Sequence, residues 1–282
     1  MLTATVLQLG VPKPLELPAV QGRAIHAWFL ERVARVAPAL AERLHEGSAL
    51  RPFTLSDLWA PSPPRVGYFS LAPGQNCQLR LTTLTEELTE AWLRALPQEG
   101  EQIPLAGGEL VVQRVWQRAE EHPWAGQASY PELLQRQVLR GKRLPRQLVL
   151  SFVSPTLFHS QGQDLPLPLP ELVFGGYLSK WNRFAPIQLP EELRQVVREQ
   201  VSLGRFHLQS RLVSFEAGQK GSHVGYVGEV TFRLRTEEPY WLLLLHLLGT
   251  YSFWCGTGRR TSMGLGQTRP WKESCEMESN KQ

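Results

Sequence analysis

The sequence predicts an α+β protein made of two tandem ferredoxin-like domains with a glycine-rich loop near the C-terminus. Two observations predict this fold class. In the first half, segments with strand-like and helix-like apolar spacing follow one another in the order β-α-β-β-α-β, which is the split βαβ pattern. The second half repeats a similar order, and a length of 282 residues is enough for two such domains. We therefore expect domains at residues 1–130 and 145–272.

The first domain is predicted from alternating strands and two helices. Strand patterns cover residues 4–9, 53–58, 66–71, 78–84 and 110–117, and helical patterns cover 25–44 and 85–96. Thr85 is the expected N-cap of the second helix. Pro38 interrupts the first helix, because proline lacks an amide hydrogen and its ring clashes with the preceding turn. We expect that helix to break near Ala37.

The second domain is predicted from strands at 147–153, 173–178, 206–215 and 224–235, with a short last strand after the loop. Its helices are expected at 190–201 and 240–254. A basic cluster lies in the segment expected between the domains, 125–145, and just beyond it. It consists of Arg136, Arg140, Lys142, Arg143 and Arg146. Such a cluster is typical either of a solvated linker or of a surface that faces RNA. The polar tail after Trp271 is expected to be disordered.

The amino-acid composition indicates the class of binding partner and the cellular compartment. Arginine accounts for 24 of the 30 basic residues, the net charge is +4 and the pI is near 9.1. This bias favours an anionic partner such as nucleic acid, although a GC-rich genome would produce it as well. Three widely spaced cysteines predict neither a zinc site nor disulfides, and they fit a reducing cytoplasm. Without a signal segment or a long apolar run, we expect a soluble protein with no membrane partner.

The segment 255–269 is the most informative part of the chain. It places Gly256, Gly258, Gly264 and Gly266 around Arg259 and Arg260. Glycine lets a backbone approach a ligand closely, and arginine offers a planar fork of donors that matches phosphate. The spacing fits neither a P-loop nor a dinucleotide fingerprint. It therefore predicts either a loop that holds a phosphate backbone or a tight turn between a helix and the last strand.

Four stretches together carry a family resemblance: residues 23–30, residues 44–45 with 51–56, residues 174–184, and the glycine-rich loop. The chain resembles the repeat-processing endoribonucleases of CRISPR systems, the sixth of the Cas protein families within the RAMP group. The resemblance implies tandem ferredoxin-like domains, no cofactor, and metal-independent cleavage of precursor CRISPR RNA within each repeat. It implies repeat RNA as a partner, both as precursor and as product. Other Cas effector subunits and a homodimer are open alternatives.

Metal-free RNA cleavage uses the 2′-hydroxyl of the substrate as nucleophile, so the protein has to supply a base, an acid and a positive charge. Histidine suits both proton transfers because its pKa lies near neutrality. His45 is the first candidate, since it ends a predicted helix where the family places its principal histidine. His26 is the second candidate, beside Arg23. The alternatives are a capping role for His45 and a packed or surface role for His26.

Geometry restricts the two histidines. In one straight helix, residues 19 apart would lie roughly 28 Å from each other. His26 and His45 can therefore share one phosphate only if the helix bends strongly at Pro38. If the helix runs straight, His45 acts alone.

The positive charge is the main departure from the family pattern. Family members often use a lysine near the histidine, yet this chain has no lysine between Lys13 and Lys142. Arg23 and Arg51 are the expected substitutes, and an arginine cannot serve as the acid. The missing lysine also favours the alternative of a catalytically silent RNA-binding subunit that holds a guide RNA.

RNA contacts are predicted in two places. Arg259 and Arg260 are expected to contact the RNA, with the four loop glycines around them. Lys180 and Arg183 lie among Tyr177, Trp181 and Phe184, and basic residues among aromatic ones suit phosphate contact with base stacking. The alternative for this second segment is a core-facing strand with solvated charges. No sequence motif indicates a metal site.

Overall fold

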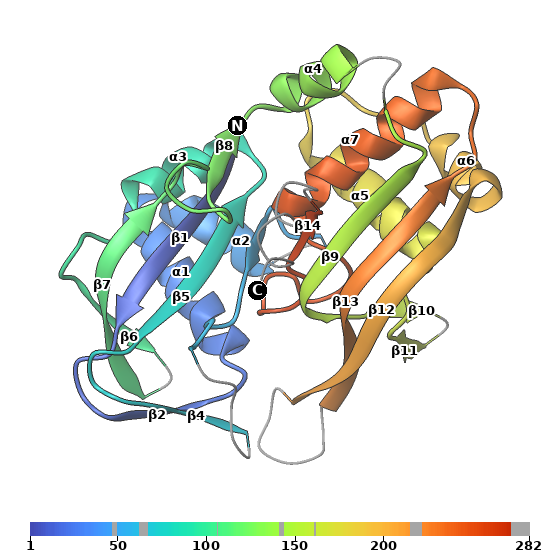
Figure 1. Cartoon of the computed structure of the whole chain (residues 1–282). Coiled ribbons are helices and arrows are strands. Elements are labelled where there is room, and N and C mark those ends of the chain that lie inside the picture. Colours follow the sequence, from blue (N-terminus) through green and yellow to red (C-terminus); the bar gives the residue numbers. More distant parts are fainter. Residues whose placement is uncertain are drawn as a thin grey trace.

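The computed structural model describes residues 1–46, 50–61, 67–105, 107–140, 144–160, 162–214 and 222–271. It confirms the predicted α+β fold of two ferredoxin-like domains. Figure 1 shows the two domains side by side, each with helices that cover one face of its sheet. The tail after Trp271 lies outside the described residues.

The first domain is an antiparallel sheet in the order β3-β5-β1-β7-β6. Its three central strands are β1 (Leu2–Gly10), β5 (Asn76–Thr83) and β7 (Gly108–Trp116), and its edge strands are β3 (Phe53–Leu55) and β6 (Gln102–Leu105). A short β8 (Gly126–Ala128) also pairs with β1, and β2 (Leu15–Pro18) pairs with β4 (Tyr68–Leu71) outside the sheet. The helices α1 (Gly22–Val36), α2 (Pro38–Glu46) and α3 (Glu86–Arg94) build the core with it, around fully buried Phe29, Phe53 and Trp92.

The second domain repeats this order of strands. Its sheet runs β12-β13-β9-β14, from β9 (Gln147–Thr156), β12 (Val201–Ser214), β13 (Ser222–Leu234) and β14 (Thr268–Pro270). The helices α5 (Pro170–Phe184), α6 (Leu193–Gln200) and α7 (Pro239–Cys255) pack on it. A small hairpin, β10 (Phe158–Ser160) with β11 (Gln163–Leu165), follows β9.

The first helix breaks where Pro38 predicts. α1 ends at Val36, Ala37 has φ −151° and ψ 70°, and α2 begins at Pro38. Proline is tolerated at the first position of a helix, because the amide there has no intrahelical partner. The chain therefore turns at Ala37, and the end of α2 can fold back toward α1.

One prediction for the second half was wrong. Residues 173–178 belong to helix α5, because Val173, Phe174, Tyr177, Leu178 and Trp181 are buried at helical spacing behind Pro170. The segment expected between the domains contains a helix, α4 (Tyr130–Arg140). Gln137 of α4 donates a hydrogen bond to Thr250 of α7 at 2.9 Å. Of the basic cluster, Lys142 and Arg143 lie outside the described residues.

A buried arginine joins the two domains. Arg80 on β5 donates hydrogen bonds to the carbonyl of Trp124 at 3.0 Å, to Gln267 at 2.6 Å and to the carbonyl of Phe253 at 2.6 Å. Burial lowers the pKa of Arg80 to about 9. The neighbouring Thr82 donates to the carbonyl of Trp254 at 2.6 Å. These bonds fix the end of α7, and thus the start of the glycine-rich loop, against the first sheet.

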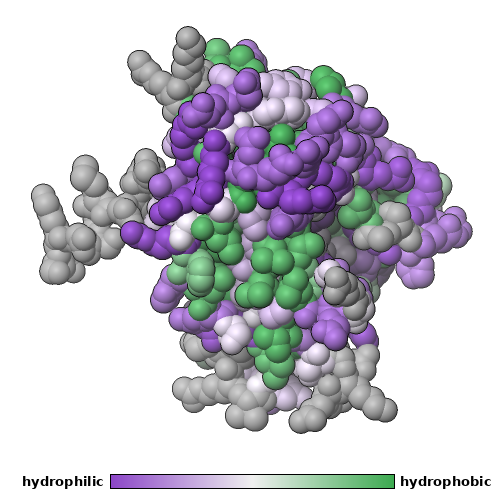
Figure 2. Space-filling model, turned by 90° about the vertical axis from the view of Figure 1, so that its right-hand side faces the viewer, coloured by the Kyte–Doolittle hydropathy of each residue, from purple (hydrophilic) through white to green (hydrophobic). Residues whose placement is uncertain are grey.

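The free edge of the second sheet is β12. Figure 2 shows that side of the molecule, where hydrophobic side chains lie between hydrophilic regions. Two exposed hydrophobic residues of β12 are Phe206, 59% exposed, and Leu212, 73% exposed. None of the helices within the described ranges is long and apolar enough to cross a membrane.

Candidate functional site

The glycine-rich loop of residues 256–266 docks on the edge of the first sheet. The backbone amide of Leu55 donates to the carbonyl of Thr261 at 2.9 Å, and the amide of Gly264 donates to the carbonyl of Leu55 at 3.0 Å. Ser56 and Gly264 form a parallel bridge. Because β3 is the edge strand, the loop satisfies backbone groups that would otherwise stay unpaired. A segment of the second domain thereby completes the first.

The loop glycines serve this docking. Gly264 has φ 96°, and a Cβ there would lie 2.5 Å from the Asp57 carboxyl group; a Cβ on Gly258, with φ 76°, would lie 2.3 Å from the carbonyl oxygen of Leu157. A larger residue would therefore be both strained and blocked. Gly256, Gly264 and Gly266 are buried and Gly258 is half-buried; their contact with RNA stays a prediction.

His26 is held by the same loop. It lies on the first turns of α1, half-buried, with its Nδ1 3.0 Å from the carbonyl oxygen of Ser262. A carbonyl oxygen only accepts, so Nδ1 carries the hydrogen, and the lone pair of the neutral ring is on Nε2. Burial lowers the pKa of His26, partly offset by the hydrogen bond to Ser262, while Arg51 and His45 lower it further.

The structure brings His45 and Arg51 toward His26. His45 is exposed near the end of α2, and Arg51 is half-buried and donates a hydrogen bond to the carbonyl of Leu44. Both are near enough to His26 to lower its pKa electrostatically. Arg23 is exposed on α1, three residues before His26 and therefore on the neighbouring part of the helix surface. The break at Pro38 thus makes the two-histidine arrangement geometrically available.

Asp57 is a residue of this site that the sequence did not reveal. Its Oδ1 accepts the amide of Gln21 at 2.9 Å, and the amide of Gly22 also binds the carboxylate. Burial raises the pKa of Asp57 to about 7, against these two hydrogen bonds. The carboxylate therefore caps the N-terminus of α1 directly beneath Gly264. Asp57 lies 36 residues after Gln21 in the chain, so no local pattern marks it as the cap of α1.

The two loop arginines lie at the surface of the loop. Arg259 and Arg260 are both half-buried, and Nη1 of Arg259 lies 2.9 Å from Oδ1 of Asp164. Arg260 has φ 55°, the left-handed conformation, and no other described non-glycine residue has a positive φ. Such a conformation costs about 1–3 kcal/mol and persists only where the surroundings impose it. The docked loop imposes it here.

The prediction for the segment around Lys180 was wrong. Lys180 is buried, and its Nζ donates to the carbonyls of Cys255 at 2.6 Å and Gly256 at 3.1 Å. Burial lowers the pKa of this ammonium group. Tyr177 and Trp181 are core residues, so they offer no surface for base stacking. Lys180 instead binds the last carbonyls of α7, while Arg183 remains exposed on the last turn of α5.

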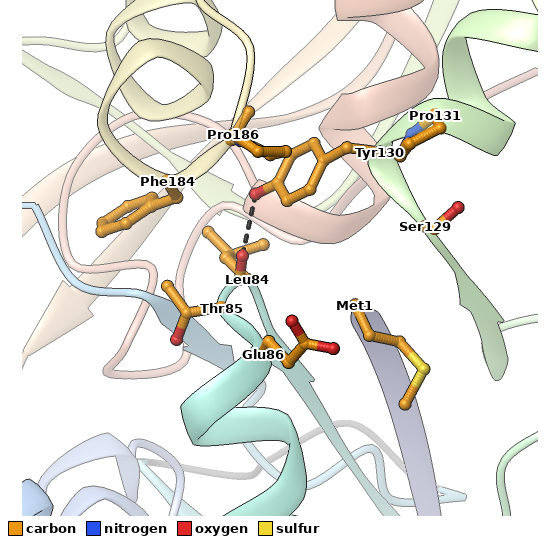
Figure 3. A pocket seen from close by; sticks show the side chains of 10 residues that line it. Met1, Leu84, Thr85, Glu86, Ser129, Tyr130, Pro131, Phe184 and Pro186 are labelled. Carbon is orange, nitrogen blue, oxygen red and sulfur yellow. Dashed lines mark hydrogen bonds between the residues drawn. The ribbon is translucent and has the colours of Figure 1, made fainter.

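Among the described residues, no three His, Cys, Asp or Glu side chains gather where they could hold a metal ion. A pocket of about 480 Å³ lies at the junction of the domains, and Figure 3 shows Tyr130 in its wall, donating a hydrogen bond to the carbonyl of Leu84 at 2.8 Å. Its walls contain none of the predicted site residues.

Comparisons with known proteins agree with this architecture. Residues 1–135 match the CRISPR Cas6 N-terminal domain, and residues 150–268 match the CRISPR-associated endoribonuclease Cas6. No curated protein matches the chain. A solved structure of Thermus thermophilus Cas6 is similar, with 30% identity, 96% of this chain and 98% of that chain covered, and a TM-score of 0.70.

Two complexes are also similar. The same Thermus protein in its product complex has 31% identity, covers 96% of this chain and 100% of that one, and gives a TM-score of 0.78. A Cas6 substrate mimic complex has 27% identity, covers 96% and 99%, and gives a TM-score of 0.72. Both family matches and these near-complete alignments lead to one conclusion. The chain belongs to the Cas6 family of CRISPR-associated endoribonucleases, which process CRISPR RNA.

Proposed function

We propose that this endoribonuclease cuts precursor CRISPR RNA within its repeats without a metal ion, by attack of a 2′-hydroxyl on the adjacent phosphate. The O2′–P bond forms while the P–O5′ bond breaks. The products are a 2′,3′-cyclic phosphate and a free 5′-hydroxyl. The observation that supports this mechanism best is the hydrogen bond between His26 Nδ1 and the Ser262 carbonyl, with His45 and Arg51 nearby.

His26 is the proposed base. Its Nδ1 hydrogen is engaged by Ser262, so Nε2 is the nitrogen that accepts the proton of the 2′-hydroxyl. The lowered pKa keeps the ring neutral at pH 7, as a base has to be. His45, exposed at the end of α2, is the proposed acid that protonates the leaving 5′-oxygen.

Positive charge is proposed to come from arginine. Arg51 has five N–H donors in a planar fork, and its hydrogen bond to the Leu44 carbonyl comes from Nη1, so the fork can also present donors to the pentacovalent phosphorane. Arg23 lies one helical turn before His26 and is the second proposed cation. Arg259 and Arg260 are the proposed contacts to the RNA backbone beyond the cut, and Arg183 is a further exposed candidate.

The test uses labelled repeat RNA from the CRISPR array of the same organism, incubated in EDTA with the wild type, His26→Ala and His45→Ala. His207→Ala is the matched control, because His207 is exposed on β12, away from both helices. Loss of either proton-transfer residue is expected to slow cleavage about 10²–10⁴-fold with RNA binding retained. A second RNA with a 2′-deoxy nucleotide at the cut should bind and stay intact.

Two results would contradict the proposal. Cleavage that requires a divalent ion would exclude the metal-free route. Cleavage of the 2′-deoxy RNA would exclude the attacking 2′-hydroxyl. Binding of every RNA without any cut would instead support the silent RNA-holding role.

A further inference from the structure

Asp164 lies outside the site described above, yet it contacts one of the residues proposed to bind RNA. It stands on β11 of the small hairpin that follows β9. Its Oδ1 accepts from Nη1 of Arg259 at 2.9 Å and lies 3.3 Å from Nδ1 of His159, while its Oδ2 contacts Nδ1 of His223. One carboxylate thus joins β10, β13 and the glycine-rich loop.

The contact leaves much of Arg259 available. The side chain of Arg259 is 40% exposed and that of Asp164 is 26% exposed, so the pair lies at the surface without being fully solvated. Asp164 engages only Nη1. A guanidinium group carries five N–H donors in a planar fork, so Nε and Nη2 can still bind a phosphate.

Charge around the carboxylate favours its ionised form. Partial burial raises the pKa of Asp164, but the hydrogen bonds with His223 and His159 and the charges of His223 and Arg259 lower it, with a net decrease. Because the ionised carboxylate is surrounded by donors, its charge is compensated within the protein. Such a carboxylate makes a charge-assisted hydrogen bond to the Arg259 guanidinium.

We propose that Asp164 is a positioning residue, which holds the Arg259 guanidinium in the orientation that contacts the RNA phosphate. The proposal rests on the proposed role of Arg259. An arginine side chain has several rotatable bonds and loses rotamer freedom when it is fixed. Asp164 fixes it before the RNA arrives, so less of that loss falls on binding.

The experiment is a double-mutant cycle on repeat RNA that carries a 2′-deoxy nucleotide at the cut, with Kd measured at several salt concentrations. Arg259→Ala is expected to weaken binding about tenfold and to reduce the salt slope by about 1. Asp164→Ala is expected to weaken binding about three- to fivefold, even though it removes a negative charge. Asp164→Asn keeps the acceptor and should restore most of the affinity. In the Arg259→Ala background, Asp164→Ala should add nothing.

Each other outcome has a distinct meaning. Equal or tighter binding by Asp164→Ala would overturn the proposal, because Asp164 would then mask Arg259. A loss that persists in the Arg259→Ala background would also overturn it, because Asp164 would then act through the hairpin. If Arg259→Ala binds the RNA as tightly as the wild type, Arg259 does not contact the RNA, and that part of the proposed function is wrong. Asp164→Ser, too short to reach Arg259, repeats the test if the alanine variant folds poorly.

Discussion

At the scale of single residues, the site depends on which nitrogen of His26 carries the hydrogen. Ser262 settles this by accepting from Nδ1 at 3.0 Å, so a backbone carbonyl prepares Nε2 for proton transfer. The identity of residue 262 matters little for this bond, because the acceptor belongs to the backbone. The sequence could suggest His26 and His45 as a pair, but it could not show this partner 236 residues away.

This arrangement predicts the pH dependence of cleavage. The proposed base works only when it is neutral, so kcat/KM should fall as the pH drops through the pKa of His26. Because that pKa is lowered from 6.5, the acid limb should lie below pH 6.5. Single-turnover cleavage between pH 4.5 and 8 measures it. His207→Ala should keep this limb and His26→Ala should lose it; an unchanged limb in His26→Ala would assign it to another group.

At the scale of elements, the glycine-rich loop is the least tolerant part of the site. Its glycines were predicted either to hold a phosphate backbone or to form a tight turn, and in the structure two of them admit Asp57 and the Leu157 carbonyl. Sequence could predict where the loop lies and that its backbone is unusual, but not what approaches it. The contact partners come from residues about 100 and 200 positions earlier, and no local pattern reports them.

Gly264→Ala should therefore destabilise the protein and impair catalysis. The left-handed φ of 96° and the 2.5 Å approach to Asp57 together predict a loss of about 2–4 kcal/mol in the free energy of unfolding. Urea unfolding and cleavage rates measure both effects. Gly176→Ala is the matched control, since a Cβ there meets nothing within 4 Å inside helix α5, so it should be neutral or stabilising by about 0.5–1 kcal/mol. Equal effects of the two substitutions would refute this account.

The helices show where sequence patterns succeed. The break at Pro38 follows from local chemistry and was predicted correctly. α5 was predicted partly as a strand, because aromatic and β-branched residues beside two glycines resemble a strand over six residues. Only the longer spacing of its buried residues, from Val173 to Trp181, reveals the helix. Lys180 was predicted at the surface because it lies among aromatic residues, and the packing of α5 buries it instead.

At the scale of the whole molecule, the proposed active centre draws on both domains. The first domain contributes His26, His45 and Arg51, and the second contributes the loop that docks over α1. Arg80 holds the two domains together, because it donates three hydrogen bonds to groups that lie at the buried contact between them. The tandem ferredoxin-like architecture was predictable from the repeated order of the elements. The contact between the domains depends on single side chains such as Arg80, which no sequence pattern marks.

Arg80→Ala should therefore loosen the pairing of the domains. Removing the guanidinium leaves the carbonyls of Trp124 and Phe253 without this donor, at a cost of about 3–5 kcal/mol. Urea unfolding followed by circular dichroism should show a lower midpoint, and cleavage should fall with it. Arg114→Ala, exposed on β7, is the matched control and should change stability by less than about 0.5 kcal/mol. A wild-type midpoint for Arg80→Ala would refute the role of this residue.

The hydrogen bond between His26 and Ser262 also has a consequence for the order of synthesis. On the ribosome, the helix that carries His26 emerges long before residue 262 is translated. Until then, the histidine lacks the acceptor that selects its tautomer, and β3 lacks the loop that covers its edge. A nascent chain that is stalled or truncated before this loop would thus carry both histidines without an assembled centre, and cellular RNA would be spared from an unfinished nuclease.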